Sequence, residues 1–460
     1  MIFGKSKNFK QEYCCTIIQI DKVEPIPNSD YLGIVMVSGL PIVVRKDQVK
    51  EGDIVFYASN ETKLVHKFLF TNNFYEDFSL NKDTTRRGYF NKYGRVRTVK
   101  LRGVQSFGFI FTLKELKNAY NINISDLTPY INTDFDSIND ELFISVYLPP
   151  IKECNSSNNH KTKKATKKAN RIDRIIPGEF NFHYDTQPLG KNLSRFNSYN
   201  IITISVKLHG TSAIFGNVKS NIPNKLPWYK KFINLFGNIY PKSHIGYSEI
   251  YSSRTVIKNR WATSENTQSY YDVDLWGEYA KLLAGKIPEG MTIYGEIIGY
   301  QTGKSTFIQK GYDYGCKPGT NKLMIYRINV EDKKGITYEW NVSDVYNWTL
   351  NFIDRYPELK PYIHPIDILY HGPIREFIPL DPAQHWQENF LKALSEDKGL
   401  GMEQLEPLCN NKVPREGIVI RIDDDPIKEA FKLKCIKFLT RESKEIDKGN
   451  VDIEMENNNY

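Results

Sequence analysis

A polar stretch near residue 160 divides this chain and constrains its fold more than any other feature. Residues 153–171 are rich in Asn, Ser, Thr and Lys and almost free of apolar side chains. Such a segment cannot bury enough apolar surface to offset the entropy lost on ordering, so it predicts a linker. At 460 residues, the chain also exceeds what one hydrophobic core normally serves. We therefore expect a domain at 1–150, a basic polar linker at 151–171, a larger domain at 172–440 and a disordered tail at 441–460.

Short β-rich runs alternate with turns in the first of these domains. The runs lie at 13–20, 33–37, 42–45, 53–58 and 107–111. Their Val, Ile, Phe and Tyr content is typical of strands, and turn residues at 50–53 and a proline-rich loop at 24–28 separate them. This pattern predicts a small OB-type β-barrel.

Beyond residue 200 the pattern changes to strands mixed with helical stretches at 271–283 and 381–394. Because strands and helices do not alternate regularly, we expect an α+β domain. The six cysteines include no C-x-x-C pair, which argues against a zinc site or a disulfide framework. We expect no membrane partner, because no run approaches eighteen apolar residues. The first residues lack a secretory pattern, so we expect an intracellular protein, cytoplasmic or nuclear.

One lysine lies at the edge of a predicted turn and is a candidate functional residue. Residues 201–215 read as strand, tight turn and strand, with Lys207 at the turn and Gly210 three residues later. Glycine adopts backbone conformations that other residues avoid and allows a ligand close to the main chain. Four-residue patterns of this kind often arise by chance, so an ordinary hairpin with a solvated lysine is the alternative.

Four later segments suit the same chemistry. Arg254 ends a predicted strand, and the carboxylates of Glu296 and Glu416 each lie beside a glycine in an apolar strand context. Lys432 and Lys434 alternate onto one strand face. Each segment alone also fits an ordinary surface arginine, sheet-edge acid or solvated lysine. A buried carboxylate is costly unless it is paired, however, so the two acids predict a functional site that receives all five segments.

The ordered segments 207–210, 253–254, 294–296, 416–420 and 432–434 resemble motifs I, Ia, III, IV and V of the covalent nucleotidyltransferases, which include ATP-dependent ligases and capping enzymes. Within that superfamily, K-L-H-G-T-S and the upstream segment 174–183 are similar to RNA ligase 2 and Naegleria-type ligases. The N-terminal run that ends in residues 94–103 is similar to the OB domain that precedes the catalytic domain of the latter. The resemblance implies an OB-type barrel followed by an adenylyltransferase domain with an ATP-grasp-like antiparallel sheet. His209 departs from the pattern, because many relatives carry an aspartate there.

The resemblance further implies an ATP-dependent RNA ligase of the kind used in RNA repair. Such an enzyme joins 3′-OH and 5′-phosphate ends through a lysyl-AMP intermediate and an RNA-adenylate, with Mg²⁺ or Mn²⁺. Lys207 would be the nucleophile, and because an ordinary lysine has a pKa of about 10.4, the enzyme must favour its neutral amine. Glu416 would hold the metal through water, and Glu416, Lys432 and Lys434 would join Lys207 as catalytic residues. The implied nucleotide-binding residues are Val206, Lys207, Gly210, Arg254, Glu296, Tyr326, Glu416, Lys432 and Lys434.

A basic run in the N-terminal half is the candidate RNA surface. The cations of this run are interleaved with aromatic residues, a mixture that can hold phosphates and stack on bases. The candidate RNA-binding cations are Arg95, Arg97, Lys100 and Arg102. We expect the protein to be a monomer and its partner to be RNA with nicked or broken ends. A charged barrel face without a ligand is the alternative. Three other functions stay open: a DNA ligase, a GTP-using mRNA capping enzyme, and a catalytically inactive RNA-binding module. The last is favoured by residues 23–32, which resemble the opening of tRNA-binding OB domains.

Overall fold

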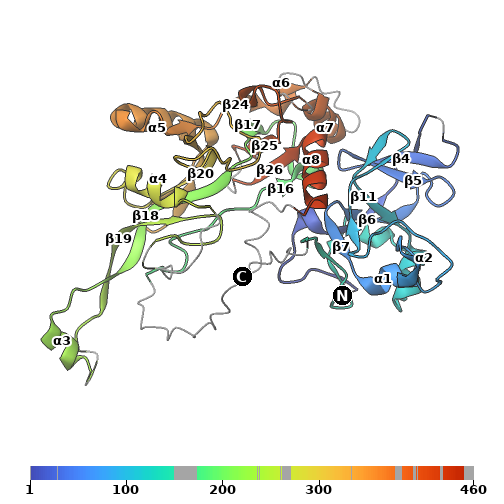
Figure 1. The fold of residues 1–460 in the computed structure, drawn as a ribbon, viewed down its shortest axis with the longest axis horizontal. Helices are drawn as coiled ribbons and strands as arrows, with labels where there is room; N and C mark the ends of the chain where they lie inside the picture. Colours follow the sequence, from blue (N-terminus) through green and yellow to red (C-terminus); the bar gives the residue numbers. More distant parts are fainter. Residues whose placement is uncertain are drawn as a thin grey trace.

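The computed structural model places two domains side by side, with the C-terminal helix α8 between them (Figure 1). It describes residues 2–27, 29–149, 174–235, 237, 239–259, 261, 271–332, 334–378, 386–396, 400, 402, 404–424 and 428–449. The linker expected at 151–171 and the end of the expected tail, 450–460, lie outside these residues. Among the described residues, no helix has the length and apolar character that a bilayer span requires.

The N-terminal domain is a set of short, twisted sheets around an aromatic core, as the sequence predicts. The expected β-rich runs form β2 (Cys15–Gln19), β4 (Leu32–Val37), β5 (Leu40–Arg45), β6 (Ile54–Ser59) and β11 (Gly108–Phe111). One sheet has the order β11-β6-β2-β12, with β12 at Asp134–Phe135, and a second has the order β3-β4-β5. β3 (Glu24–Pro25) is a two-residue strand within the segment expected to be a loop.

Shorter strands and two helices complete this domain. The strands are β1 (Phe3–Gly4), β7 (Thr62–Leu64), β8 (Arg95–Val96), β9 (Val99–Leu101), β10 (Val104–Ser106), β13 (Ser137–Ile138), β14 (Glu141–Leu142) and β15 (Ile144–Val146), and the helices are α1 (His66–Thr71) and α2 (Leu113–Ala119). Buried phenylalanines fill the space between them. The rings of Phe56 and Phe111 stack with centroids 5.0 Å apart.

Two sheets form the larger domain. The first has the order β16-β26-β25-β17-β24, from Gln187–Pro188, Ala430–Lys434, Gly417–Ile422, Ile201–Lys207 and Ile368–Pro373. The second has the order β19-β18-β20-β21-β22, from Ser243–Ser252, Thr211–Pro223, Met291–Gly299, Asn321–Glu331 and Thr337–Glu339, and β23 (Ile363–Pro365) also pairs with β21. The helices of this domain are α4 (Leu275–Leu283), α5 (Val342–Arg355), α6 (Ile374–Phe377) and α7 (Trp386–Glu396).

The two expected helices of this domain are present with shifted bounds. The stretch at 271–283 becomes helical only at Leu275, because the Asp274 side chain accepts a hydrogen bond from Gly277 N and caps the first turn. The stretch at 381–394 corresponds to α7, and residues 381–385 lie outside the described part.

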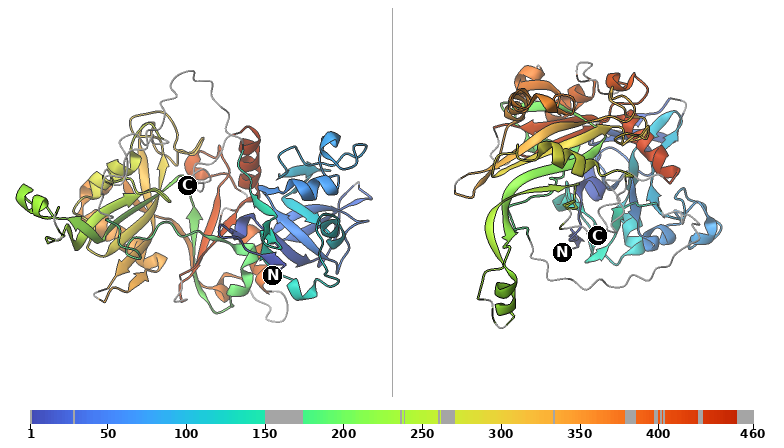
Figure 2. Two further views of the ribbon diagram at one scale, coloured as in Figure 1. Left: turned by 90° about the horizontal axis from the view of Figure 1, so that it is seen from below. Right: turned by 60° about the vertical axis from the view of Figure 1, so that its left-hand side comes forward.

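β18 and β19 continue beyond the sheet as a two-stranded arm, which Figure 2 shows from two sides. The helix α3 (Trp228–Ile233) lies at its tip. Side-chain hydrogen bonds order the tip, including one from Tyr240 N to Asn234 Oδ1 of 2.9 Å. Trp228 is 80% exposed there.

The expected disordered tail begins with a helix, which corrects the boundary at residue 440. α8 spans Ile436–Asp447, and the Cys435 thiol accepts a hydrogen bond from Phe438 N at its start. Phe438 and Ile446 are buried. The many charges of this segment suggested a solvated tail, but its apolar residues recur at helical spacing and face a partner. α8 packs on both domains, because Ile436 and Leu439 pack on the core of the N-terminal domain and Phe438 belongs to the core of the larger domain.

A second contact between the domains lies beside β16. Lys191 donates hydrogen bonds to the Gln11 carbonyl at 2.9 Å and to Thr16 Oγ1 at 3.0 Å. Gly190 packs so closely on Ser38 that a Cβ at Gly190 would lie 2.3 Å from the Ser38 carbonyl oxygen. The two domains are therefore docked by buried polar and close backbone contacts.

Candidate active site

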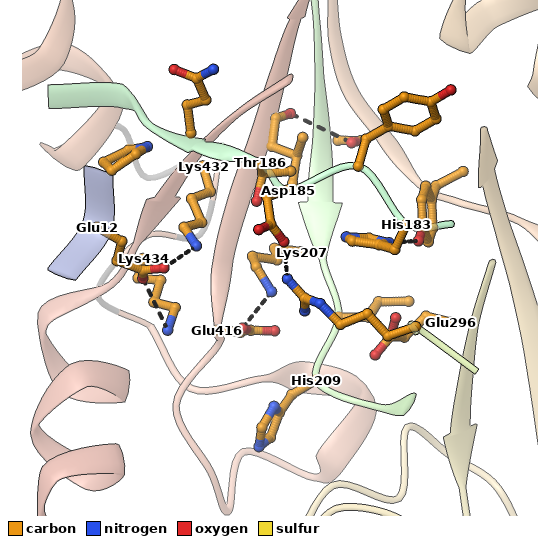
Figure 3. Close-up of a pocket in the computed structure, with 18 of the residues that line it drawn as sticks. Glu12, His183, Asp185, Thr186, Lys207, His209, Glu296, Glu416, Lys432 and Lys434 are labelled. Atoms are coloured by element: carbon orange, nitrogen blue, oxygen red, sulfur yellow. Dashed lines mark hydrogen bonds and ion pairs between the residues drawn. The ribbon is translucent and has the colours of Figure 1, made fainter. Parts of the chain in front are cut away.

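A cavity of about 510 Å³ lies where the two sheets of the larger domain meet the N-terminal segment (Figure 3). Its volume is within the range of small-molecule sites. All the residues expected to bind a nucleotide line it: Val206, Lys207, Gly210, Arg254, Glu296, Tyr326, Glu416, Lys432 and Lys434. Their individual roles stay predictions.

Strand register explains why the three lysines converge. Lys207 of β17 pairs with Gly417 of β25, which in turn pairs with Lys434 of β26. Residues in one such row point to the same face of a sheet. Lys432 lies two residues before Lys434 and so shares this face, while the alternate residues of the three strands pack into the core below.

Gly417 allows β26 to pack closely on β25 between these lysines. Its φ is +155°, and a Cβ there would lie 2.1 Å from the Leu433 carbonyl oxygen. No other residue fits this position without displacing β26, because real Cβ contacts are never so short. Glycine is thus required where the strand passes between Lys207 and Lys434.

Glu416 lies directly against the predicted nucleophile. Lys207 Nζ is 2.5 Å from Glu416 Oε1, and Glu416 is 3% exposed. Its other oxygen, Oε2, is buried and has no hydrogen-bond partner among the described residues. A buried carboxylate oxygen without a donor is unusual and fits a cation or its water shell.

A divalent cation at this position would take few protein ligands. The described part of the chain contains no group of three or more His, Cys, Asp and Glu residues arranged to hold a metal. Magnesium commonly binds through one or two carboxylates and keeps water and substrate phosphates as its other ligands. Glu416 therefore fits the predicted water-mediated metal site.

Lys432 and Lys434 meet a carboxylate from the other domain. Glu12, in a 3₁₀ turn at Gln11–Tyr13, places Oε2 2.5 Å from Lys432 Nζ and Oε1 3.7 Å from Lys434 Nζ. Lys434 Nζ also lies 3.1 Å from Glu442 Oε1 of α8. Burial lowers the pKa of Lys432, whereas for Lys434 the pull of Glu442 and Glu12 outweighs burial and raises its pKa well above the ordinary value.

The opposite wall carries the remaining predicted residues. Glu296 Oε1 accepts a hydrogen bond of 3.0 Å from Gly210 N, and Arg254 pairs with Asp185. The Tyr326 hydroxyl lies 3.1 Å from His183 Nδ1. Burial, reinforced by nearby cations, lowers the pKa of His183 well below its usual value, so its ring is neutral at physiological pH.

Gly210 differs from its sequence interpretation, and the contacts of its neighbour His209 are defined by the structure. Gly210 has no left-handed φ; it is required because a Cβ would lie 2.3 Å from the Ile297 carbonyl oxygen of β20. The ring of His209 packs edge-on against Tyr312 and Phe438, with centroids 5.0 and 5.1 Å away. His209 therefore anchors the turn after Lys207 on α8.

The expected RNA-binding residues lie outside the cavity lining, and one of them is buried. Arg95 is 2% exposed and pairs with Glu61 and with Asp447 of α8. The expectation of an RNA contact is wrong for Arg95, because its guanidinium joins the N-terminal domain to α8. Lys100 and Arg102 are exposed and Arg97 is partly exposed, so their predicted RNA contacts stay predictions.

Sequence reasoning missed three acidic residues that meet the predicted cations of the cavity. Glu12 precedes the first β-rich run and carries no recognisable pattern. Glu442 lies in the segment expected to be disordered. Asp185 follows the segment 174–183 that carried part of the family resemblance, so its position alone was a usable signal.

The fold and the cavity together define a two-domain protein. The N-terminal barrel is docked beside a cavity of the larger domain that lysines and glutamates line. The family model described as RNA ligase matches residues 200–438, and an OB-fold domain model matches residues 14–113. The chain belongs to the RNA ligase family. No curated protein matches it.

Solved structures with a similar fold include those of Naegleria gruberi RNA ligase. The structure with PPi is 16% identical, with a TM-score of 0.51, and the match covers 95% of this chain and 100% of that chain. An arginine-to-alanine mutant with ATP and Mn is 17% identical, with a TM-score of 0.50, covering 95% of this chain and 99% of that chain. At these identities the likeness concerns the fold.

Proposed function

We propose that this protein is an ATP-dependent RNA ligase that joins 3′-OH and 5′-phosphate RNA ends through a lysyl-AMP intermediate on Lys207. The observation that carries the proposal is the contact of 2.5 Å between Lys207 Nζ and buried Glu416, in a cavity that Lys432 and Lys434 also line. A reactive lysine beside an anion-binding pair suits attack on a phosphate. Family membership supplies the reaction class.

ATP and Mg²⁺ or Mn²⁺ are the proposed cofactors. Complexes of Naegleria gruberi RNA ligase with ATP and Mn support this choice, as does the partnerless oxygen of Glu416. A divalent cation held through Glu416 would supply positive charge that favours the neutral amine of Lys207 and offsets the phosphate charge. Without it, pairing with Glu416 favours the ammonium form, which is not a nucleophile.

Lys207 Nζ would then form a bond to the α-phosphorus of ATP, and the bond from that phosphorus to the pyrophosphate oxygen would break. Lys432 and Lys434 lie on the same sheet face and would hold the α-phosphate oxygens. Arg254 and Glu296 would orient the ribose, and the Tyr326 ring would lie against adenine. AMP next passes to the RNA 5′-phosphate, which restores the Lys207 amine, and the 3′-OH displaces AMP to seal the strand.

RNA with nicked or broken ends is the proposed partner. The protein is proposed to act on it as a monomer. We propose an intracellular location, cytoplasmic or nuclear; the five described cysteines are buried and form no disulfide with one another, as is usual in reducing compartments.

Labelling with α-³²P-ATP tests the proposal. Wild-type protein with Mg²⁺ or Mn²⁺ should retain label on a denaturing gel, and pyrophosphate should remove it. Lys207→Ala should retain none, whereas Lys50→Ala, at an exposed lysine outside the cavity lining, should label normally. Attachment of GMP from GTP would favour a capping enzyme, and sealing of DNA nicks alone would favour a DNA ligase.

A further inference from the structure

The N-terminal domain places an acid in the cavity that the proposed reaction does not use. Figure 3 shows Glu12 entering from the N-terminal segment toward Lys432 and Lys434. One carboxylate oxygen meets each ammonium group, at 2.5 Å and 3.7 Å. The Glu12 side chain is 27% exposed and that of Lys432 is 14% exposed, so this pairing is partly buried.

This carboxylate is ionised at neutral pH. Burial would raise the pKa of Glu12, but Lys432 and Lys434 overcome that effect and lower the pKa to about 2. A charged carboxylate offers two oxygens to two ammonium donors, as a phosphate would. The two lysines therefore already hold an anion at the position where the proposed function needs the α-phosphate of ATP.

We propose that Glu12 is an internal competitor for the phosphate position, which its side chain occupies in the nucleotide-free enzyme and leaves when a nucleotide phosphate binds. This inference rests on the proposed function for the assignment of the phosphate to ATP. One anion replaces another on the same two cations, so the lysines never lack a counter-charge. Glu12 thereby lowers the affinity of the lysine pair for a nucleotide, because its carboxylate has to be displaced before the phosphate can bind.

Contacts around Glu12 allow its side chain to leave without separating the domains. Neighbouring Gln11 is held through its side chain by Asp134 at 2.8 Å and by Asn192 at 2.9 Å. Its carbonyl accepts the hydrogen bond from Lys191. The turn thus stays docked through Gln11, and only the Glu12 side chain has to rotate.

The test compares Glu12→Gln with Glu24→Gln. Glutamine keeps the shape and removes the charge, and Glu24 is a matched control because it is an exposed acid of the same domain paired with Lys22. Glu12→Gln should lower the KM for ATP in adenylylation roughly tenfold, about 1.4 kcal/mol. The adenylylation rate at saturating ATP should change less than about twofold, because the competitor is absent from the nucleotide complex. Glu24→Gln should change neither.

A binding measurement separates this inference from the proposed activity. In the Lys207→Ala background, which cannot form an adduct, AMP binding by calorimetry should tighten roughly tenfold on adding Glu12→Gln, because AMP carries the α-phosphate. Unchanged or weaker AMP binding, with an unaltered denaturation midpoint, would overturn the role of Glu12. If wild-type protein never becomes adenylylated while Glu12→Gln still tightens AMP binding, the ligase proposal fails and the role of Glu12 as a competitor stands.

Discussion

Replacing Arg95 by methionine removes the cation that links the N-terminal domain to α8. Arg95 Nε lies 2.6 Å from Glu61 Oε2, and both side chains are at most 4% exposed. Removing one partner of such a buried pair leaves an uncompensated charge, which costs about 3–5 kcal/mol. Asp447 also pairs with Arg95, at 2.7 Å, but is 49% exposed, so Asp447→Asn should cost only about 0–1 kcal/mol.

Urea denaturation followed by tryptophan fluorescence and circular dichroism measures both changes. With a dependence of about 2 kcal/mol per molar urea, Arg95→Met should lower the midpoint of the transition that includes this interface by roughly 1.5–2.5 M. Arg97→Met, at the partly exposed neighbour, is the matched control and should shift it little. A loss below about 1 kcal/mol for Arg95→Met, or one equal to that of Asp447→Asn, would refute the reasoning from burial.

Two further predictions concern the lysine-bearing sheet and the RNA surface. Gly417→Ala should destabilise the protein by more than about 2 kcal/mol and abolish adenylylation, because its Cβ would meet the Leu433 carbonyl at 2.1 Å. Thermal denaturation measures the loss, with Gly237→Ala as the control because the nearest atom there is 3.9 Å from the added Cβ. Near-normal stability of Gly417→Ala would contradict the prediction. Combined replacement of Arg97, Lys100 and Arg102 by alanine should weaken binding to nicked duplex RNA and reduce the slope of log affinity against log salt by up to about 3, whereas an unchanged slope would place the RNA elsewhere.

Local patterns in the sequence predict the catalytic sheet well. Alternation of apolar and polar residues depends only on neighbours in the chain, so the shared face of Lys432 and Lys434 follows from their spacing. The motifs around Lys207 and Glu416 likewise mark strand ends that the register of β17 and β25 brings together. Both arrangements are properties of adjacent antiparallel strands.

Contacts between the domains lie beyond such reasoning. Glu12 and Lys432 are 420 positions apart, and no pattern near either residue indicates the other. A run of basic residues likewise does not reveal which cation meets a carboxylate. Arg95 was assigned to RNA from its basic run, and its partner Asp447 lies 352 positions away. Docking depends on the shapes of two complete surfaces, which composition and periodicity do not encode.

The position of α8 means that the chain connection through residues 151–171 is not the sole connection between the two halves of this polypeptide. The last described helix, encoded after the catalytic motifs, covers apolar residues of the first domain, so the chain crosses between its halves and then returns. A protease cut within 151–171 would leave two fragments joined by the Arg95 pairs, the Lys191 hydrogen bonds and the buried face of α8. Expressing residues 1–150 alone would instead expose that apolar face to solvent and favour self-association.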